Sequence, residues 1–447
     1  MARFPVLGGL AILCSACGPY DSRLLSMHTE ENRAAKARHR WDAVRGTVKL
    51  QLAEEHLKAG RIPEAEKALE ESLAMCPDDA NVYLLATRLR LDQGRLAEAR
   101  EAVTVAASLS THEPEVPYLA GVVDQRYGDL ETAFEHYSHA AALAPNVADY
   151  LQAQAEVLIA LDRPIDALEL VQPRLRDFDQ NVALRMLASR ISRILGLRGP
   201  AVDYCREAAR IAEKDEAIST QLGLLLTWAE QYEEAKSVLR PIVETRFPAE
   251  LPRNSPTETE SHTRSPSIVF GLARAYIETS QPEDARQLLR RLTPQERTAP
   301  LPCLLYARAS IMLSDFQGAA AALEASHRRN PPTTESLVMA AFAALHLADY
   351  DGVRSAVDGV LELDADFAPA HCLRGQAAEA EGHWDEARAS YEQALAVDPG
   401  SWTARSRLDA IMDARRAEDL FDDSLQGESV GDDQQRDSTN VSEEEER

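Results

Sequence analysis

LAEEHLKAGRIPEAEKALEESLAMCP at residues 52–77 and LRGQAAEAEGHWDEARASYEQALAVDP at residues 373–399 repeat one pattern, and this pattern decides the fold. Each stretch has a small residue early, a glycine before the middle, a Glu-Ala pair soon after it, and a proline near the end. Glycine ends a helix because it adopts positive φ readily, and proline cannot continue one. Each stretch therefore predicts two helices joined by a tight turn.

The pattern returns at a nearly fixed interval along the chain. Repeats begin at residues 46, 80, 114, 148, 182, 216, 266, 300, 334 and 368. The eighth place of each repeat is small: Ala53, Thr87, Gly121, Ala155, Ser189, Gly223, Ala273, Ala307, Ala341 and Gly375. The twentieth place is alanine in all but one: Ala65, Ala99, Ala133, Ala167, Ala201, Ala235, Ala285, Ala319, Val353 and Ala387. Small side chains at these places allow two antiparallel helices to approach to about 8–10 Å, so we expect both places to lie in the contact.

These helix–turn–helix units of about 34 residues resemble the tetratricopeptide repeat, TPR. The resemblance implies an all-α fold, an α-solenoid superhelix of about ten repeats, with repeats 1–6 at 46–249 and repeats 7–10 at 266–401. Residues 402–416 follow as an amphipathic helix, in which we expect Trp402, Leu408 and Ile411 to cover the exposed end of the stack.

Three segments fall outside the repeats. Residues 250–265 are rich in Pro, Ser, Thr and Glu, which predicts a flexible insertion, either passive or acting as a hinge or partner-binding loop. Residues 417–447 carry twelve acids against two arginines and few apolar residues, which predicts a disordered acidic tail. Residues 18–45 read as a linker and a basic N-terminal helix with Thr29 as its cap. Its basic residues could contact anionic lipid headgroups or form an ordinary solvated face.

The first 17 residues predict a targeting segment. Arg3 precedes an apolar run from Phe4 to Leu13, which is too short to span a bilayer. Small residues then precede Cys17, as in the lipobox of bacterial lipoproteins, although Cys14 stands where an aliphatic residue is usual. This resemblance implies lipidation of Cys17 and a protein that faces the periplasm, and Gly18 favours the outer membrane. A plain secretory signal is the alternative.

Charge and motifs exclude several classes of function. A formal net charge of -25 argues against a nucleic-acid partner. The four cysteines beyond the leader are scattered singly and read as core residues, and His136 and His139 lack a third metal ligand. No catalytic or phosphate-binding motif is present. We therefore expect no enzyme activity, no cofactor, no metal and no small-molecule substrate.

The TPR resemblance places partner binding in a groove lined by the first helix of each repeat. The ninth place, which should point into this groove, carries four arginines in an otherwise acidic protein: Arg88, Arg190, Arg274 and Arg308. Arginine pairs well with carboxylates, so these residues suit an acidic partner, although pairing within the stack would also satisfy them. Four aromatic residues are further candidates for the groove or the core: Tyr118, Trp228, Phe270 and Phe342.

The sequence as a whole predicts a non-catalytic scaffold lipoprotein. It would bind proteins or peptides in a bacterial envelope assembly, such as a pilus, secretion or export machinery. One alternative is an accessory subunit that recruits an enzyme of exopolysaccharide synthesis or export. A cytoplasmic adaptor or co-chaperone is another, although the leader and the missing carboxylate clamp disfavour it.

Overall fold

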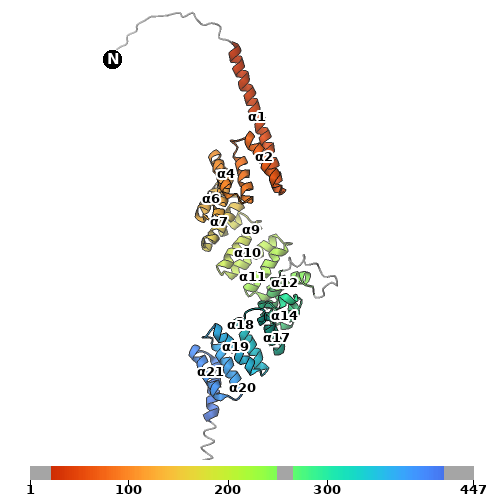
Figure 1. The fold of residues 1–447 in the computed structure, drawn as a ribbon, viewed down its shortest axis with the longest axis vertical. Coiled ribbons are helices and arrows are strands. Elements are labelled where there is room, and N and C mark those ends of the chain that lie inside the picture. Colours follow the sequence, from red (N-terminus) through yellow and green to blue (C-terminus); the bar gives the residue numbers. More distant parts are fainter. Residues whose placement is uncertain (1–21, 249–264, 417–447) are drawn as a thin grey trace, which may run out of the picture. The chain divides into compact units, whose positions relative to one another are not determined.

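The computed structural model describes residues 22–248 and 265–416, and throughout these ranges the regular structure is helical, with no strand. The all-α solenoid fold expected from the repeats is confirmed (Figure 1). The chain forms two compact units, residues 1–197 and 198–447, and each is described by itself. Their boundary falls inside the fifth repeat, between its two helices.

The first unit holds four hairpins followed by a single helix, α9. Its elements are α1 (Ser22–Lys58), α2 (Ile62–Met75), α3 (Ala80–Asp92), α4 (Leu96–Leu109), α5 (Glu115–Tyr127), α6 (Leu130–Leu143), α7 (Ala148–Ala160), α8 (Pro164–Val171), the 3-10 helix η1 (Gln172–Arg176) and α9 (Val182–Ile194). Each hairpin after the first packs on the one before it, so the apolar residues form successive local clusters.

The second unit begins with the single helix α10 and continues with five hairpins. Its elements are α10 (Arg198–Ile211), α11 (Glu216–Trp228), α12 (Tyr232–Arg246), α13 (Ser267–Glu278), α14 (Pro282–Leu289), α15 (Pro294–Arg297), α16 (Pro300–Met312), α17 (Phe316–His327), α18 (Thr334–His346), α19 (Tyr350–Leu363), α20 (Ala368–Ala380) and α21 (Trp384–Val397). A further helix occupies residues 402–416.

The small residues of the eighth and twentieth places are buried in every repeat, as expected. Where the eighth place is glycine, a larger side chain from the second helix fills the space. An added Cβ would lie 2.7 Å from the Tyr137 ring at Gly121 and 2.7 Å from the Tyr391 ring at Gly375. Glycine at these two places therefore makes room for a tyrosine in the helix contact.

All ten turns between paired helices contain one residue with positive φ, always at the fifteenth place of the repeat. Five of these residues are the predicted glycines: Gly60, Gly94, Gly128, Gly196 and Gly382. The other five are not glycine and were not predicted: Asp162, Glu230, Ser280, Ser314 and Ala348. Packing of the two helices fixes this backbone geometry even where the residue does not favour it.

A polar side chain at the twenty-first place of one repeat often reaches the turn of the next. We call these contacts the turn ladder. Its rungs are Glu66–Arg95 at 2.7 Å, Arg100–Asp129 at 3.3 Å, Lys236–Gln281 at 2.9 Å, Arg286–Asp315 at 2.6 Å and Arg354–Glu381 at 2.5 Å. Each rung joins neighbouring hairpins of one unit.

The N-terminal helix differs from its prediction. Instead of a separate helix ahead of the first repeat, α1 runs without a break from Ser22 to Lys58. Thr29 therefore lies inside the helix and is not its cap. No proline near residue 46 interrupts the helix. Gly46 lies inside it and packs against Met75 and Cys76 at the end of α2.

The predicted insertion at 250–265 lies almost wholly outside the described residues, but the hairpins on either side of it pack directly together. Leu239 and Phe247 share one core cluster with Ile268 and Tyr276. The Lys236 ammonium also donates to the Thr279 hydroxyl at 3.0 Å. This shared core favours a passive insertion over a hinge, and it agrees with a unit boundary located elsewhere.

The helix at 402–416 caps the last hairpin, but not with all the predicted residues. Ile411 is buried and Leu408 is partly buried against Tyr391 and its neighbours. Trp402 is 79% exposed, so its predicted covering role is wrong; Ala404, two residues later, is buried in its place. Trp402 is the first residue of the helix, and its side chain is largely in solvent.

Other predictions concern residues outside the described ranges. The leader at 1–17 with Cys17, and the acidic tail at 417–447, belong to this group. Among the helices that the structure describes, none is both long and apolar enough to cross a membrane.

Candidate partner-binding groove

A groove of about 590 Å³ crosses the first helices of the last three hairpins. It is lined by Arg308, Ile311 and Met312 of α16, Val338, Met339 and Phe342 of α18, Ala368, Pro369, Cys372, Leu373 and Gln376 of α20, Asp398 and Ser401 before the capping helix, and Thr403 within it. Nine of these fourteen side chains are apolar, so a partner segment with apolar side chains fits this surface best.

The groove brings together the ninth places of three successive repeats, Arg308, Phe342 and Gln376. The side chain of Phe342 is half-buried, with its ring 6.3 Å from Phe316 and 4.6 Å from His346. The His346 ring in turn stacks on Phe316 with centroids 4.2 Å apart. These contacts hold one edge of Phe342 in place while another edge lines the groove.

Two flexible side chains widen the range of shapes that the groove can bind. Met312 is exposed and Met339 is half-buried, and both line the groove. Methionine is unbranched and polarizable, so it adapts to irregular apolar partners. The groove therefore suits an apolar segment without demanding one fixed side-chain shape.

The polar groups of the groove are largely used within the protein. Arg308 donates from Nη1 to Glu278 Oε1 at 2.9 Å, and this pair neutralises its charge. Cys372 lies with its Sγ 3.8 Å from the Ser401 hydroxyl. Burial raises the pKa of the Cys372 thiol, so it is uncharged at neutral pH. The groove thus offers little net charge to a partner.

The structure uses three of the four predicted groove arginines in ion pairs inside the stack. Arg88 pairs with Glu115, Arg190 lies 3.7 Å from Glu156, and Arg308 pairs with Glu278. Arg274 is exposed, and within residues 22–248 and 265–416 it makes no ion pair. These contacts match the alternative of pairing within the stack. A partner carboxylate would have to compete with an existing one at three of the four positions.

The other three aromatic candidates contact residues of their own and neighbouring repeats. The Tyr118 ring lies 5.6 Å from Tyr137 and 5.0 Å from Tyr150. Phe270 packs against the cluster that contains Ile268 and Tyr276, and the Arg198 guanidinium lies 5.7 Å from the ring centre of Trp228. The structure therefore places Phe342, and not these three, in the groove described here.

The four arginines and the four aromatic candidates predicted from the sequence include only two residues of the groove lining, Arg308 and Phe342. The groove also uses the fifth and sixth places (Val338, Met339, Cys372, Leu373) and the twelfth and thirteenth places (Ile311, Met312). These places are three or four residues from the ninth, so they share one helix face with it. An apolar pattern at these spacings was the signal that could have revealed them.

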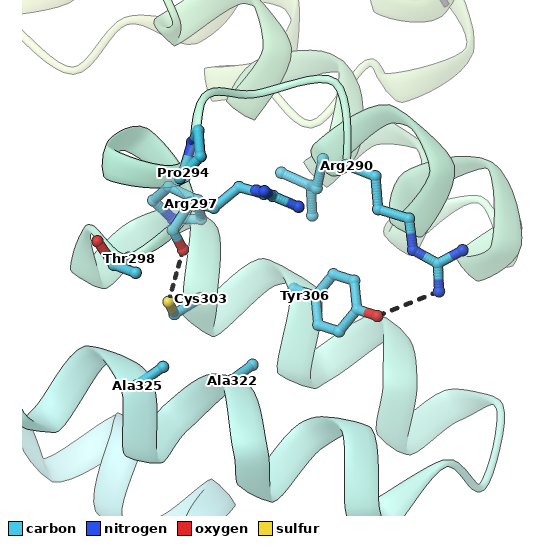
Figure 2. Close-up of a pocket in the computed structure, with 10 residues that line it drawn as sticks. Arg290, Pro294, Arg297, Thr298, Cys303, Tyr306, Ala322 and Ala325 are labelled. Carbon is cyan, nitrogen blue, oxygen red and sulfur yellow. Dashed lines mark hydrogen bonds between the residues drawn. The ribbon is translucent and has the colours of Figure 1, made fainter.

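A second pocket, of about 490 Å³, lies away from the groove (Figure 2). It forms where α14 ends early and the one-turn helix α15 precedes α16. The Arg290 guanidinium donates to Tyr306 Oη at 3.3 Å, and the Cys303 thiol donates to the Arg297 carbonyl at 2.8 Å. Ala322 lines the opposite wall. This pocket is a product of the irregular end of the seventh repeat, which packs against the eighth.

The cysteines behave as the sequence suggested. Cys205, Cys303 and Cys372 are buried, Cys76 is half-buried, and all four are free thiols. Burial raises the pKa of the Cys205 thiol to about 11, so this side chain is not a nucleophile near neutral pH. His136 bonds to Asp124 at 2.8 Å, and among the described residues no cluster of three metal-binding side chains occurs.

Two family models match this chain, and both describe the tetratricopeptide repeat: one covers residues 50–114 and the other residues 368–401. The chain belongs to the tetratricopeptide repeat superfamily. Residues 50–114 cover most of the first two repeats identified in the sequence, and residues 368–401 coincide with the tenth repeat. Because TPR stacks bind proteins and peptides, this TPR chain is a protein–protein interaction scaffold.

Solved structures of other TPR proteins are similar to it in part. The PilF protein of Pseudomonas aeruginosa is 17% identical over 47% of this chain and 95% of its own, with a TM-score of 0.41. YrrB, described as a TPR protein with an unusual peptide-binding site, is 17% identical over 50% of this chain and 98% of its own, with a TM-score of 0.35. The TPR domain of P58(IPK) is 15% identical over 83% of this chain and 99% of its own, with a TM-score of 0.35. No curated protein matches the sequence. The family assignment therefore rests on the two family matches.

Proposed function

We propose that this TPR protein is a membrane-anchored scaffold that binds an apolar segment of a partner protein in the groove over α16, α18 and α20. The carrying observation is the continuous apolar surface formed by Met312, Phe342 and Leu373 from three successive first helices. A partner helix or extended segment with apolar side chains every three or four residues, or on alternate residues, would cover this surface. Arg308 adds a polar contact at the margin.

Site-specific photocrosslinking tests the groove directly. A photoreactive amino acid at Met312 is exposed and lines the groove, whereas the same group at Leu363 is exposed and lies outside the residues that line it. We expect the Met312 position, and not the Leu363 position, to capture one discrete partner from envelope extracts. Equal capture at both positions would contradict the proposal.

A matched pair of substitutions supplies the control for binding. Met312→Glu places a charge in the apolar groove and should weaken capture by the identified partner at least about tenfold, since burying an unpaired charge is costly. Leu363→Glu changes a similarly exposed apolar side chain outside the groove and should leave binding unchanged. Both variants should keep the helical circular dichroism of the original chain.

We further propose that Cys17 is lipidated and anchors the scaffold to the periplasmic face of a bacterial envelope membrane, where it holds parts of an assembly together. The support is the sequence MARFPVLGGLAILCSAC, in which an apolar run and small residues precede Cys17. Two or more acyl chains would give stable anchoring. Labelled fatty acid should enter the original protein and be absent from Cys17→Ala. Equal labelling of the two would overturn the anchor and leave the groove proposal intact.

A further inference from the structure

The N-terminal helix α1 carries an exposed apolar stripe, made of Trp41, Val44, Val48 and Leu52. These side chains are 65%, 58%, 57% and 37% exposed, respectively. Their spacing of three, four and four residues places them on one face of the helix. The opposite face, with Leu50 and Ala53, is buried in the core of the first hairpin.

The residues equivalent to this face are buried in later repeats of the first unit. Val48 and Leu52 hold the third and seventh places of the first repeat. The same places in the second repeat are Val82 and Ala86, which are fully buried in one cluster with Leu69 of the preceding hairpin. Val116, Leu184 and Ala188 are equivalent residues of later repeats in the first unit, and they are buried too. The stripe is therefore a face that a helix covers elsewhere in the stack.

The charges along α1 indicate which helix covers it. Arg38 lies at the N-terminal end of the stripe and Glu55 at its C-terminal end, and both are exposed. A second copy of α1 laid antiparallel would set Val44 against Val48, with Trp41 against Leu52. The same register brings Arg38 opposite Glu55, and both residues flank the stripe. The stripe is thus complementary to itself in both apolar and charged positions.

A parallel arrangement lacks this complementarity. In parallel pairing, Arg40 of one copy would lie beside Arg45 of the other, and like charges at such positions are destabilising. We propose that two copies of this protein associate through α1, antiparallel, with the stripe at the centre. This inference stands apart from the proposed groove and membrane anchor.

The strength of the association follows from its size. Four apolar side chains cover less area than the roughly 1,200–2,000 Å² of a typical stable interface. Arg45 also lies close to the two-fold axis and faces its own copy. The dimer is therefore weak, with a dissociation constant on the order of micromolar, and Arg45→Gln should tighten it.

Sedimentation equilibrium on residues 18–447, which keep every described helix, tests the dimer. We expect dimer to accumulate as concentration rises from about 1 µM to about 100 µM. The variant Val44→Glu with Val48→Glu should be monomeric across this range, a loss of at least about tenfold in affinity. Leu363→Glu is the matched control, because it changes an equally exposed apolar residue elsewhere, and it should dimerise normally.

Charge exchange tests the antiparallel register. Arg38→Glu alone and Glu55→Arg alone should each weaken the dimer, and the double variant should restore it, since the pair is re-formed with reversed sign. Neither residue is buried, so loss of folding is not expected, and circular dichroism checks it. A chain that stays monomeric at about 100 µM, a dimer that survives the Val44 and Val48 substitutions, or a double variant that stays weak would each overturn the proposal.

Discussion

The ninth and tenth repeats each pair a helix of 13 residues with a helix of 14 residues but pack the pair with different side chains. In the ninth, Ala341 of α18 lies at the eighth place, with Val357 of α19 at the twenty-fourth. In the tenth, Gly375 of α20 and Tyr391 of α21 hold these places, and all four residues are buried. In the ninth repeat a small side chain faces one of medium size. In the tenth, a glycine without a side chain faces a large one.

The repeat keeps the spacing between its two helices constant, and not any one residue. A tyrosine is tolerated in the contact only because its partner has no side chain. The tyrosine hydroxyl also gains a function that valine cannot supply. Tyr391 Oη donates to Glu379 Oε2 at 2.8 Å, and Arg407 of the capping helix donates to the other oxygen of Glu379 at 2.9 Å. The tenth repeat is thereby linked to its cap.

The largest expected effect comes from replacing the eighth-place glycine of the tenth repeat by alanine, the residue of the ninth. Gly375→Ala would place a Cβ 2.7 Å from the Tyr391 ring, and overpacking of this kind costs about 1–3 kcal/mol. Adding Tyr391→Val should recover much of the loss, since the pair then matches Ala341 and Val357. Denaturant unfolding of the single and double variants measures this coupling. Additive losses would show that the two places act independently.

A smaller effect is expected when only the tyrosine hydroxyl is removed. Tyr391→Phe loses a hydrogen bond to a carboxylate, and such a bond contributes about 1.5–3 kcal/mol to stability. The net loss is smaller, because Glu379 keeps its contact with Arg407 and can bind water instead. Tyr137→Phe in the third repeat is the matched control, because its hydroxyl donates to the neutral amide oxygen of Gln125. Thermal unfolding should show the larger loss for Tyr391→Phe, and equal losses would rule out a special link to the cap.

The turns of the same two repeats predict changes of opposite sign. Ala348 has a φ of 57° and Gly382 has a φ of 80° at the equivalent place. A residue with a Cβ is disfavoured there by about 1–2 kcal/mol, so Ala348→Gly should stabilise the protein by up to about 1 kcal/mol after the entropy cost of glycine. Gly382→Ala should destabilise it by a similar amount. Parallel urea titrations would detect both shifts, and a loss on Ala348→Gly would contradict this account.

The smallest expected difference concerns pH. The fourth place is Leu337 in the ninth repeat and His371 in the tenth. Burial and the nearby Arg374 lower the pKa of His371, so the unfolded chain binds a proton more readily than the folded one. Stability should therefore fall as pH drops from about 6.5 through the lowered folded-state pKa. His371→Leu should flatten this dependence between about pH 5 and pH 7, and an unchanged slope would exclude His371 as its source.

Repetition made much of the fold predictable. The ten repeat starts, the buried eighth and twentieth places and the five glycine turns all follow from spacing and residue size. The other five turns, such as Ala348 and Glu230, could not be predicted, because packing imposes their geometry against local preference. The continuous α1 was missed because the repeat pattern begins at residue 46 although the helix does not.

The candidate groove was only partly predictable. Arg308 and Phe342 line it as the ninth-place rule indicated, whereas the ion pair between Arg308 and Glu278 depends on which acid the preceding hairpin brings close. Such contacts between repeats are set by three-dimensional register and not by local sequence. The apolar surface of the groove is formed by several helices together, so the sequence of a single repeat does not predict it.

The turn ladder has a consequence for how this protein responds to salt. Each rung, such as Arg286–Asp315 or Arg354–Glu381, joins a hairpin only to its immediate neighbour and lies at a partly solvated edge. Counter-ions screen such contacts, while the apolar contacts within a hairpin are little affected. Ionic strength should therefore set the cooperative length of unfolding: at low salt several hairpins melt as a block, and at high salt the ends fray one hairpin at a time.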